Sequence, residues 1–190
     1  MVMSRYLHTL TILAAAAVLA AAAPVPKAKP GQKDPSPNGN ALVKTHKDRL
    51  TFARSSDWQG WPPEKAFDGN PDTSWFSATG DTPVGDKLPW VAVTFPHDVA
   101  VRRVTVLGNR ETSSPSGYTV LVGRLELLDK DGRAVIRAER EAKGDRSDFD
   151  FVLSEPFGRV RTVRFTAVQD DTSAGRSQTR CVGVAEVQVE

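Results

Sequence analysis

The residues from Asp68 to Thr73 place two carboxylates, an amide and a hydroxyl within a short stretch of chain. Gly69 can adopt a positive φ, and Pro71 keeps the preceding residue out of the α region, so the chain is expected to turn tightly here. A tight turn points several carbonyl oxygens inward. Together with the Asp68 carboxylate and the Thr73 hydroxyl, they could supply most of the about six to eight oxygens that calcium prefers. The stretch therefore predicts a metal-binding loop, and the alternative is a polar turn that holds no ion.

The spacing of these residues does not match the helix–loop–helix calcium motif. Counted from Asp68, the sixth position is Thr73, where the motif has glycine, and the twelfth is Thr79, where it has glutamate. No helix is expected on either side of the loop. That motif is therefore excluded.

Positive and negative side chains are nearly equal in number after position 40. Four of the 25 basic residues and one of the 23 acidic residues lie in the first 40 positions, so the following 150 residues carry 21 basic and 22 acidic side chains. A nucleic-acid-binding domain needs a clear basic surplus. We therefore expect no nucleic-acid partner.

The N-terminus has the pattern of an export signal. Residues 1–23 combine Arg5, an apolar run and a cluster of small residues, which is typical of a secretory signal peptide. Residues 24–44 are rich in proline and are expected to form a flexible linker before a single domain at 45–190. The mature protein is thus predicted to be secreted or periplasmic. Cys181 is the only cysteine, so no disulfide can form within the chain, and we expect a small buried side chain there.

Short segments with alternating apolar residues dominate the predicted domain. One helical turn is expected at 62–67, where prolines stand at its start. Period-two alternation and turn residues predict strands throughout the rest, which indicates an all-β sandwich. The eight expected strands are residues 50–53, 90–95, 99–107, 118–128, 134–138, 149–153, 163–167 and 182–189.

The run from Asp68 to Trp75 resembles the D-G-N-x-x-T-x-W signature of the discoidin family. That family comprises the coagulation factor 5/8 type C domains and the family-32 carbohydrate-binding modules. The resemblance extends over residues 45–190 and includes Trp90–Phe95 and the closing Val184–Val189. It implies an eight-stranded antiparallel jelly-roll β-sandwich of the galactose-binding-domain-like type.

The same resemblance implies a set of calcium ligands. Backbone carbonyls and polar side chains of the loop would be joined by residues of the last strand, so that the ion acts as a structural clamp. Glu186 is the ligand for which the sequence gives separate support, because a carboxylate between apolar neighbours needs a partner if it is buried; otherwise it is a solvent-facing residue. The implied ligands are Lys65, Asp68, Asn70, Thr73, Ala185 and Glu186.

Two tryptophans, Trp58 and Trp61, lie in the loop before the polar turn. Carbohydrate-binding relatives hold sugars on loops at one end of the sandwich, where aromatic rings pack on sugar C–H faces and polar groups bind the hydroxyls. The resemblance therefore implies that both rings contact a ligand. Trp61 precedes two prolines, and its alternative role is to cap the core.

Arg110 and Phe76 complete the expected ligand site. In sugar-binding relatives an arginine occupies a position similar to Arg110, whose five donors suit vicinal hydroxyls; its alternative is a surface ion pair with Glu111 or Asp57. Phe76 stands where galactose-binding members often carry histidine, which removes a polar contact and argues against galactose.

No enzyme motif is present in the sequence, and no catalytic residues are expected. The three histidines lack acidic or cysteine partners at metal-binding spacing. We predict an exported, non-catalytic binding module for carbohydrate. The alternative is a protein-interaction or adhesion domain of the cell envelope. Binding to an anionic membrane surface is the least favoured function. It needs basic residues beside exposed apolar loop tips, and no lysine is expected beside the two tryptophans.

Overall fold

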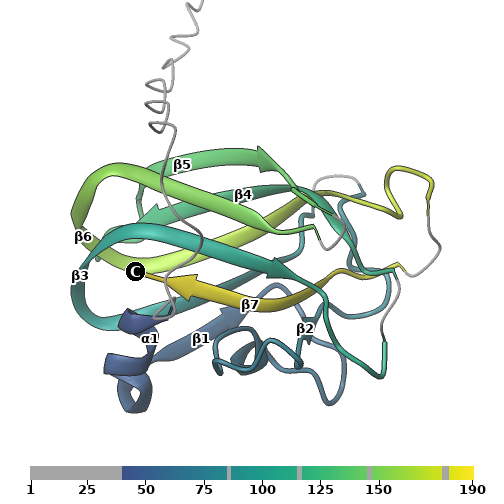
Figure 1. Ribbon diagram of the computed structural model, residues 1–190, viewed down its shortest axis with the longest axis horizontal. Helices are drawn as coiled ribbons and strands as arrows, with labels where there is room; N and C mark the ends of the chain where they lie inside the picture. Colours follow the sequence, from purple (N-terminus) through teal and green to yellow (C-terminus); the bar gives the residue numbers. More distant parts are fainter. Residues whose placement is uncertain (1–39, 85–86, 115–116, 145–146, 177–179) are drawn as a thin grey trace, which may run out of the picture.

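The computed structural model describes residues 40–84, 87–114, 117–144, 147–176 and 180–190. The predicted signal peptide and most of the predicted linker lie outside these residues. No helix among them is long and apolar enough to cross a membrane. Three helical turns and seven strands appear in the order α1 (Ala41–His46), η1 (Lys47–Arg49), β1 (Thr51–Arg54), η2 (Pro63–Ala66), β2 (Trp75–Phe76), β3 (Trp90–Gly108), β4 (Val120–Leu128), β5 (Ala134–Glu141), β6 (Phe149–Asp170) and β7 (Gly183–Val189) (Figure 1).

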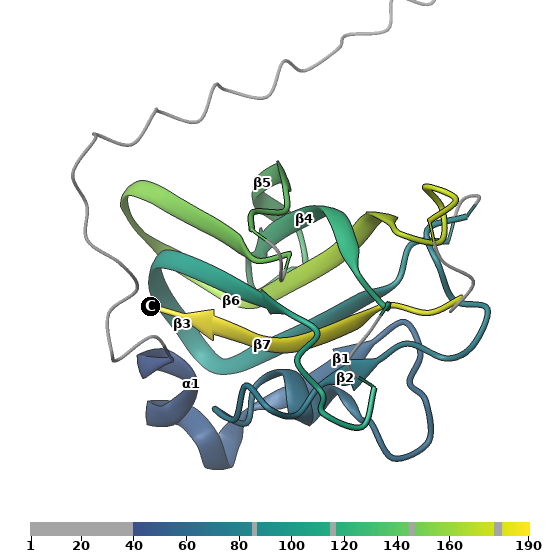
Figure 2. The ribbon, with the colours of Figure 1, turned by 45° about the vertical axis from the view of Figure 1, so that its right-hand side comes forward.

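The sheet folds over on itself because two long strands bend. Its order is β2-β7-β3-β6-β4-β5, with β1 added to β3, and all the pairs are antiparallel. β3 pairs with β6 on both sides of the bend, and the register shifts lie between Thr94 and Arg103. Both strands curve sharply at the same end of the molecule (Figure 2). The predicted β-sandwich is therefore confirmed, although the segments 90–95 and 99–107 are one strand, as are 149–153 and 163–167.

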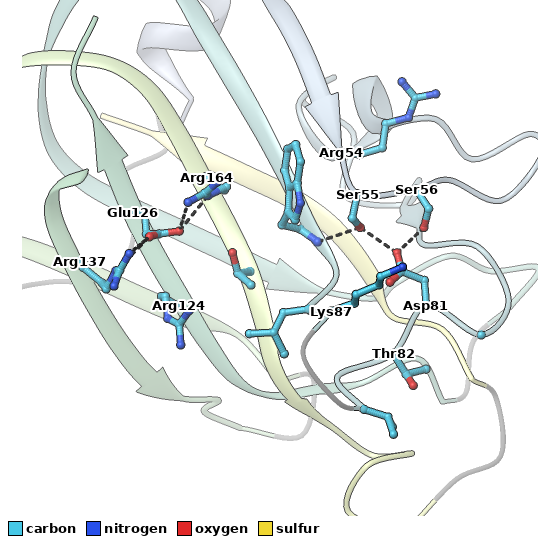
Figure 3. A pocket seen from close by; sticks show the side chains of 15 residues that line it. Arg54, Ser55, Ser56, Asp81, Thr82, Lys87, Arg124, Glu126, Arg137 and Arg164 are labelled. Atoms are coloured by element: carbon cyan, nitrogen blue, oxygen red, sulfur yellow. Dashed lines mark hydrogen bonds and ion pairs between the residues drawn. The ribbon is translucent and has the colours of Figure 1, made fainter. Parts of the chain in front are cut away.

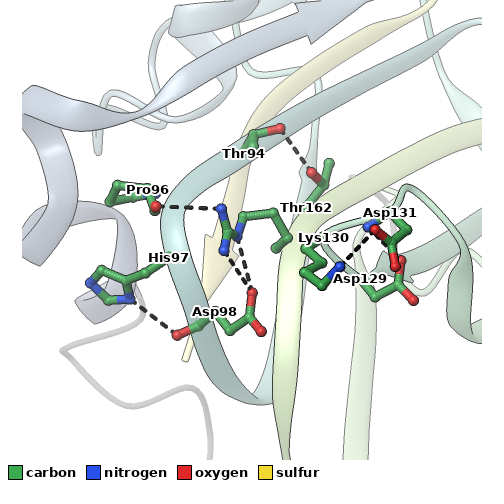
Figure 4. A network of polar contacts seen from close by, with 9 residues as sticks. Thr94, Pro96, His97, Asp98, Asp129, Lys130, Asp131 and Thr162 are labelled. Carbon is green, nitrogen blue, oxygen red and sulfur yellow. Dashed lines mark hydrogen bonds and ion pairs between the residues drawn. The ribbon is translucent and has the colours of Figure 1, made fainter.

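Polar side chains hold the bend of β3 in place (Figure 4). Pro96 lacks an N–H group and cannot continue the ladder. Arg161 forms an ion pair of 2.9 Å with Asp98 and donates to the carbonyl oxygen of Pro96 at 3.4 Å. The hydroxyls of Thr94 and Thr162 lie 2.8 Å apart across the two strands. The bend is thus fixed by contacts between β3 and β6.

The core lies between the two layers that the bends create. Val93 and Phe95 before the bend and Val104 and Val106 after it belong to one buried cluster. The alternating apolar side chains that predicted two separate strands therefore face the same interior from both halves of β3. Gly123 of β4 lets an aromatic ring approach the backbone, because a Cβ atom there would lie 2.4 Å from Phe165.

Helix α1 begins inside the segment predicted to be a linker and crosses the predicted domain boundary. Val43 is buried in the core cluster, and the ring of His46 packs edge-on against His97 at a centroid distance of 4.7 Å. The helix begins directly after Asn40, which is itself buried. Ordered structure therefore starts before the predicted domain boundary at residue 45.

Candidate functional site

The polar loop after η2 has the tight geometry that the sequence predicts. The Asp68 carboxylate accepts hydrogen bonds from the Asn70 N–H and the Thr73 hydroxyl, both at 2.8 Å. The Thr73 hydroxyl also lies 3.0 Å from the carbonyl oxygen of Asn70. Gly69 adopts a φ of +81°, which favours glycine. Three of the predicted metal ligands are thus brought together by local turn geometry.

Glu186 of β7 joins this loop from the far end of the chain. Its side chain is fully buried, and its Oε2 atom accepts the Gly69 N–H at 3.1 Å. Burial, and next the negative charge of Asp68, raise the pKa of Glu186 to about 8. The loop and the last strand therefore meet at a buried carboxyl group, as the clamp prediction requires.

Asn40 is a member of this site that the sequence analysis missed. Its amide Nδ2 donates to Glu186 Oε1 at 2.5 Å, and its Oδ1 accepts the Val189 N–H at 3.4 Å. The positive charge of Lys44 on α1 acts to lower the pKa of Glu186. Asn40 stands within a proline-rich polar segment, so no local pattern marks it as part of a folded site.

Ala185 lies at an irregularity of β7. Leu107 pairs with Glu186 and Gly108 pairs with Val184, so that Ala185 has no partner residue on β3. A bulge of this kind interrupts the regular ladder. It leaves the backbone of Ala185 out of the β3 register beside Glu186, where a carbonyl ligand is predicted.

The donor set suits calcium better than a transition metal. The described residues contain no group of three or more histidine, cysteine, aspartate or glutamate side chains that could hold an ion. The loop and β7 instead offer two carboxylates, Asp68 and Glu186, together with hydroxyl and carbonyl oxygens. Hard cations such as calcium prefer this all-oxygen mixture, whereas zinc prefers nitrogen and sulfur. Lys65 can contribute only its backbone carbonyl, because its ammonium group is positively charged and has no lone pair for a cation. That group lies 5.7 Å from the centre of the Trp61 ring.

The two predicted ligand-contact tryptophans sit on a tight turn. The Trp61 N–H donates to the Trp58 carbonyl at 2.9 Å, and Gly60 between them has a φ of +94°. Their ring centroids are 5.6 Å apart. Trp58 is 39% exposed and Trp61 is half-buried. The expectation that no lysine lies beside this pair is wrong, because Lys65 reaches the Trp61 ring.

The ring of Phe76 packs against that of Trp61. It is only 1% exposed, and its ring lies edge-on to Trp61 at 5.8 Å and to Tyr118 at 4.8 Å. A Cβ atom on Gly183 would come within 2.6 Å of it. This burial corrects the prediction that Phe76 touches a ligand. Tyr118, which the sequence analysis did not single out, belongs to the same row of rings.

Arg110 is turned inward and holds its own loop. Its Nη2 atom pairs with Asp148 at 2.8 Å, and its Nη1 donates to the carbonyl of Gly108 at 3.2 Å. The side chain is only 14% exposed. The ion pair expected as the alternative role is therefore present, but its partner is Asp148 and not Glu111 or Asp57. Ligand contact by Arg110 stays a prediction.

Cys181 is buried, as predicted. Burial, and next the charges of Asp170 and Asp171, raise the pKa of its thiol to about 12. A pKa this high keeps the thiol protonated near neutral pH, which disfavours the thiolate that a nucleophile or soft metal ligand needs.

Comparison with known proteins agrees with this architecture. The sequence profile of the F5/8 type C domain matches residues 51–182. A family 32 carbohydrate-binding module of Clostridium perfringens NanJ, solved with galactose, superposes with a TM-score of 0.60 at 15% identity, covering 76% of this chain and 95% of that one. A Clostridium perfringens module solved with GalNAc-β-1,3-galactose has a TM-score of 0.57 at 13% identity, with coverages of 76% and 96%.

A fucose-binding module of Streptococcus pneumoniae is also similar. It has a TM-score of 0.54 at 14% identity, covering 75% of this chain and 93% of that one. At these identities the likeness shows a shared fold. No curated protein sequence matches the chain.

Proposed function

The chain belongs to the F5/8 type C domain family, and from this premise we propose that it is an exported, non-catalytic module that binds carbohydrate and carries a structural calcium ion. The sugar site that we propose is the turn bearing Trp58 and Trp61. Its support comes from one observation above all, the exposure of Trp58 on a turn fixed by backbone hydrogen bonds.

A fixed aromatic ring is suited to the apolar face of a sugar. The Trp58 N–H donates to the Phe76 carbonyl at 2.9 Å, which fixes the backbone that carries the ring, and the ring itself lies 5.6 Å from that of Trp61. A pre-ordered turn reduces the entropy lost on binding. Trp61 lies beside it and Phe76 lies behind Trp61. The pyranose ring would stack on Trp58, while its hydroxyls bind polar groups of the neighbouring loops.

The solved relatives suggest which sugars to test first. Their bound or named ligands are galactose, GalNAc-β-1,3-galactose and fucose. Because the Arg110 guanidinium is paired with Asp148, this chain offers fewer free side-chain donors at the rim than its sequence predicted. We therefore expect weak binding of single sugars, in the millimolar range that corresponds to about 4 kcal/mol.

Titration of the mature chain with these sugars, after a glycan-array screen, tests the proposal. Trp58→Ala should weaken binding at least about tenfold, as expected when a stacked ring is removed. Trp58→Phe is the matched variant, and it should retain most of the affinity because it keeps a flat apolar face. If Trp58→Ala binds as well as the parent, the sugar site is elsewhere or absent.

A protein-interaction role in the cell envelope is the alternative, and the inward direction of Arg110 favours it. A site with an exposed ring but few free donors resembles an apolar anchor for a protein partner. Absence of any glycan binding, together with co-purified envelope proteins that are lost in Trp58→Ala, would support this alternative.

Calcium would be held by the loop 68–73 and β7. Asp68 and Glu186 would supply charge, Asn70 and Thr73 would supply neutral oxygens, and Lys65 and Ala185 would supply backbone carbonyls. The ion would relieve the repulsion between the two carboxylates and tie the loop to the last strand. Export depends on the predicted signal peptide at 1–23, and N-terminal sequencing of protein recovered outside the cytoplasm tests it.

A further inference from the structure

A cavity of about 1170 Å³ lies over the sheet layer built by β3, β6, β4 and β5 (Figure 3). Its floor consists of side chains that alternate with core residues, so it lies on the outer face of this layer. Trp90, for example, precedes buried Val91, and Arg164 precedes buried Phe165. The predicted ligand contacts of the tryptophan turn are not among the described residues that line the cavity.

The strand register arranges the side chains of this face, most of them polar or charged, in two rows. Neighbouring positions in each row come from neighbouring strands, and cross-strand pairs of this kind lie within contact distance. The first row is Ala92, Arg164, Glu126 and Arg137, and the second is Trp90, Thr166, Arg124 and Glu139.

A buried carboxylate organises the first row. Glu126 is almost completely buried, and it binds Arg137 through Oε1 and Arg164 through Oε2, each at 2.6 Å. Burial acts to raise the pKa of Glu126, but the hydrogen bonds from Arg137 and Arg164 outweigh it and hold the pKa below its usual value. One carboxylate thus holds two guanidinium groups, which leaves one positive charge in surplus on the face.

The Arg137 guanidinium is the exposed member of this group, and it lines the cavity. Arg137 is 61% exposed, so the N–H groups that Glu126 does not use are open to solvent there. Positive side chains outnumber negative ones in the lining by five to two, and by five to four when the ion-pair partners Asp57 and Glu139 are added. The positive residues are Arg54, Lys87, Arg124, Arg137 and Arg164.

The face also carries an aromatic ring. Trp90 is half-buried, and the Arg164 guanidinium lies 5.8 Å from the centre of its ring. Hydroxyl groups of Ser55 and Thr166 border the same space. A flat ring, hydroxyl groups and a local surplus of guanidinium donors suit a ligand that is polyhydroxylated and anionic.

We propose that this outer sheet face is a second binding site, separate from the tryptophan turn, and that it takes a carboxylated polysaccharide. Sugar carboxylates would pair with Arg137 and Lys87, and a sugar ring would lie against the exposed part of Trp90. A nucleic acid fits less well, because the residues after position 40 carry 21 basic and 22 acidic side chains and offer no wide basic field.

Titration of the mature chain with oligogalacturonate, alongside a neutral galactose oligomer of the same length, tests this site. Arg137→Gln should weaken oligogalacturonate binding about fivefold, as expected for one partly exposed charged hydrogen bond, and Arg137→Gln with Lys87→Gln about 20-fold. Binding should also weaken as salt is raised from about 0.05 M to about 0.5 M. Arg164 still pairs with Glu126 in these variants, so the fold should persist.

Arg133→Gln is the matched control. Arg133 is 79% exposed and does not line the cavity, and the substitution makes the same change of charge. Its affinity should stay within about twofold of the parent. If Arg137→Gln lowers the melting temperature, Lys87→Gln alone gives a separate reading, because no ion pair joins Lys87 to the described residues.

Three results would overturn the proposal. The first is no binding of oligogalacturonate. The second is binding that is lost in Trp58→Ala but kept in Arg137→Gln. The third is equally tight binding of polyglutamate with the same sensitivity to Arg137→Gln, which would assign the face to acidic peptides. Retention of oligogalacturonate binding in Trp58→Ala supports the second site, even if the sugar proposal for the tryptophan turn fails.

Discussion

Without the proposed calcium ion, the stability of the domain should depend on pH through Glu186. In the folded chain without metal, burial raises the pKa of this carboxyl group to about 8 from its ordinary value of 4.5. The folded state therefore binds a proton more tightly than the unfolded state does. Its stabilisation is complete below about pH 4.5, and it is lost as the pH rises toward 8.

The size of this effect follows from the shift. A difference of about 3.5 pH units corresponds to about 5 kcal/mol in the free energy of unfolding, at 1.36 kcal/mol per unit. For a domain of this size, that equals a fall in melting temperature of roughly 10 to 20 °C. If the proposed calcium site exists, calcium should reverse the loss at pH 8, because the ion would bind the ionised carboxylates, and should have little effect at pH 5.

Thermal unfolding with chelator and with calcium, at several pH values between 5 and 8, measures both effects. Glu186→Gln should abolish the stabilisation by calcium and the loss of stability toward pH 8. Glu155→Gln is the control, since it removes an exposed carboxylate of β6. If the chelated parent is equally stable at pH 5 and pH 8, the reasoning about the buried carboxyl group is wrong. If the pH dependence is present but calcium does not change it, only the calcium proposal falls.

Three further changes test the surrounding structure. Asn40→Ala removes a buried hydrogen bond to Glu186, and it should lower the free energy of unfolding by about 1 to 3 kcal/mol in urea titrations; no loss would mean that Asn40 is not part of the folded domain. Gly123→Ala should cost about 1 to 3 kcal/mol in the same assay because its Cβ would collide with Phe165, and a neutral result would show that the ring can move aside. Burial, and next the charges of His97 and Arg49, lower the pKa of His46. In the Glu186→Gln background, stability should therefore fall as the pH drops below about 6.5, and His46→Gln should remove that fall.

The sequence predicts local features of the fold better than features that depend on the whole chain. Alternation along 90–95 and 99–107 correctly predicts which side chains enter the core. It does not reveal that a single strand bends between them, because the bend depends on Arg161 reaching Asp98 from another strand. Helix α1 was missed for a similar reason. It is a short helix, too short to form alone, and the packing of Val43 against the core stabilises it.

The same distinction holds for the candidate site. The turn at 68–73 is determined by adjacent residues. Its internal hydrogen bonds follow from the turn-forming properties of asparagine, glycine and proline. The direction of a loop side chain is not local. Arg110 turns inward because Asp148, distant in sequence, offers it a carboxylate, and Phe76 is buried because Gly183 leaves room for its ring. Residue type alone does not distinguish such inward positions from ligand contacts.

The proposed calcium clamp and the tryptophan turn should be separable by mutation, because different partners anchor them. The Glu186 carboxylate accepts a hydrogen bond from the Gly69 N–H, whereas the Phe76 carbonyl accepts one from the Trp58 N–H. β2, which carries Phe76, pairs with Gly183 and Val184, ahead of Glu186 on β7. That pairing does not use the Glu186 side chain.

Glu186→Gln should therefore lower the melting temperature and leave sugar affinity within about twofold of the parent, measured well below the transition. Trp58→Ala should do the reverse, because a half-exposed ring contributes little to the core. A loss of sugar affinity of more than about tenfold in Glu186→Gln, with the chain still folded, would mean that the clamp shapes the binding surface. The loop 68–73 would then be part of the ligand site, in addition to its structural role of joining the start of the sandwich to its last strand.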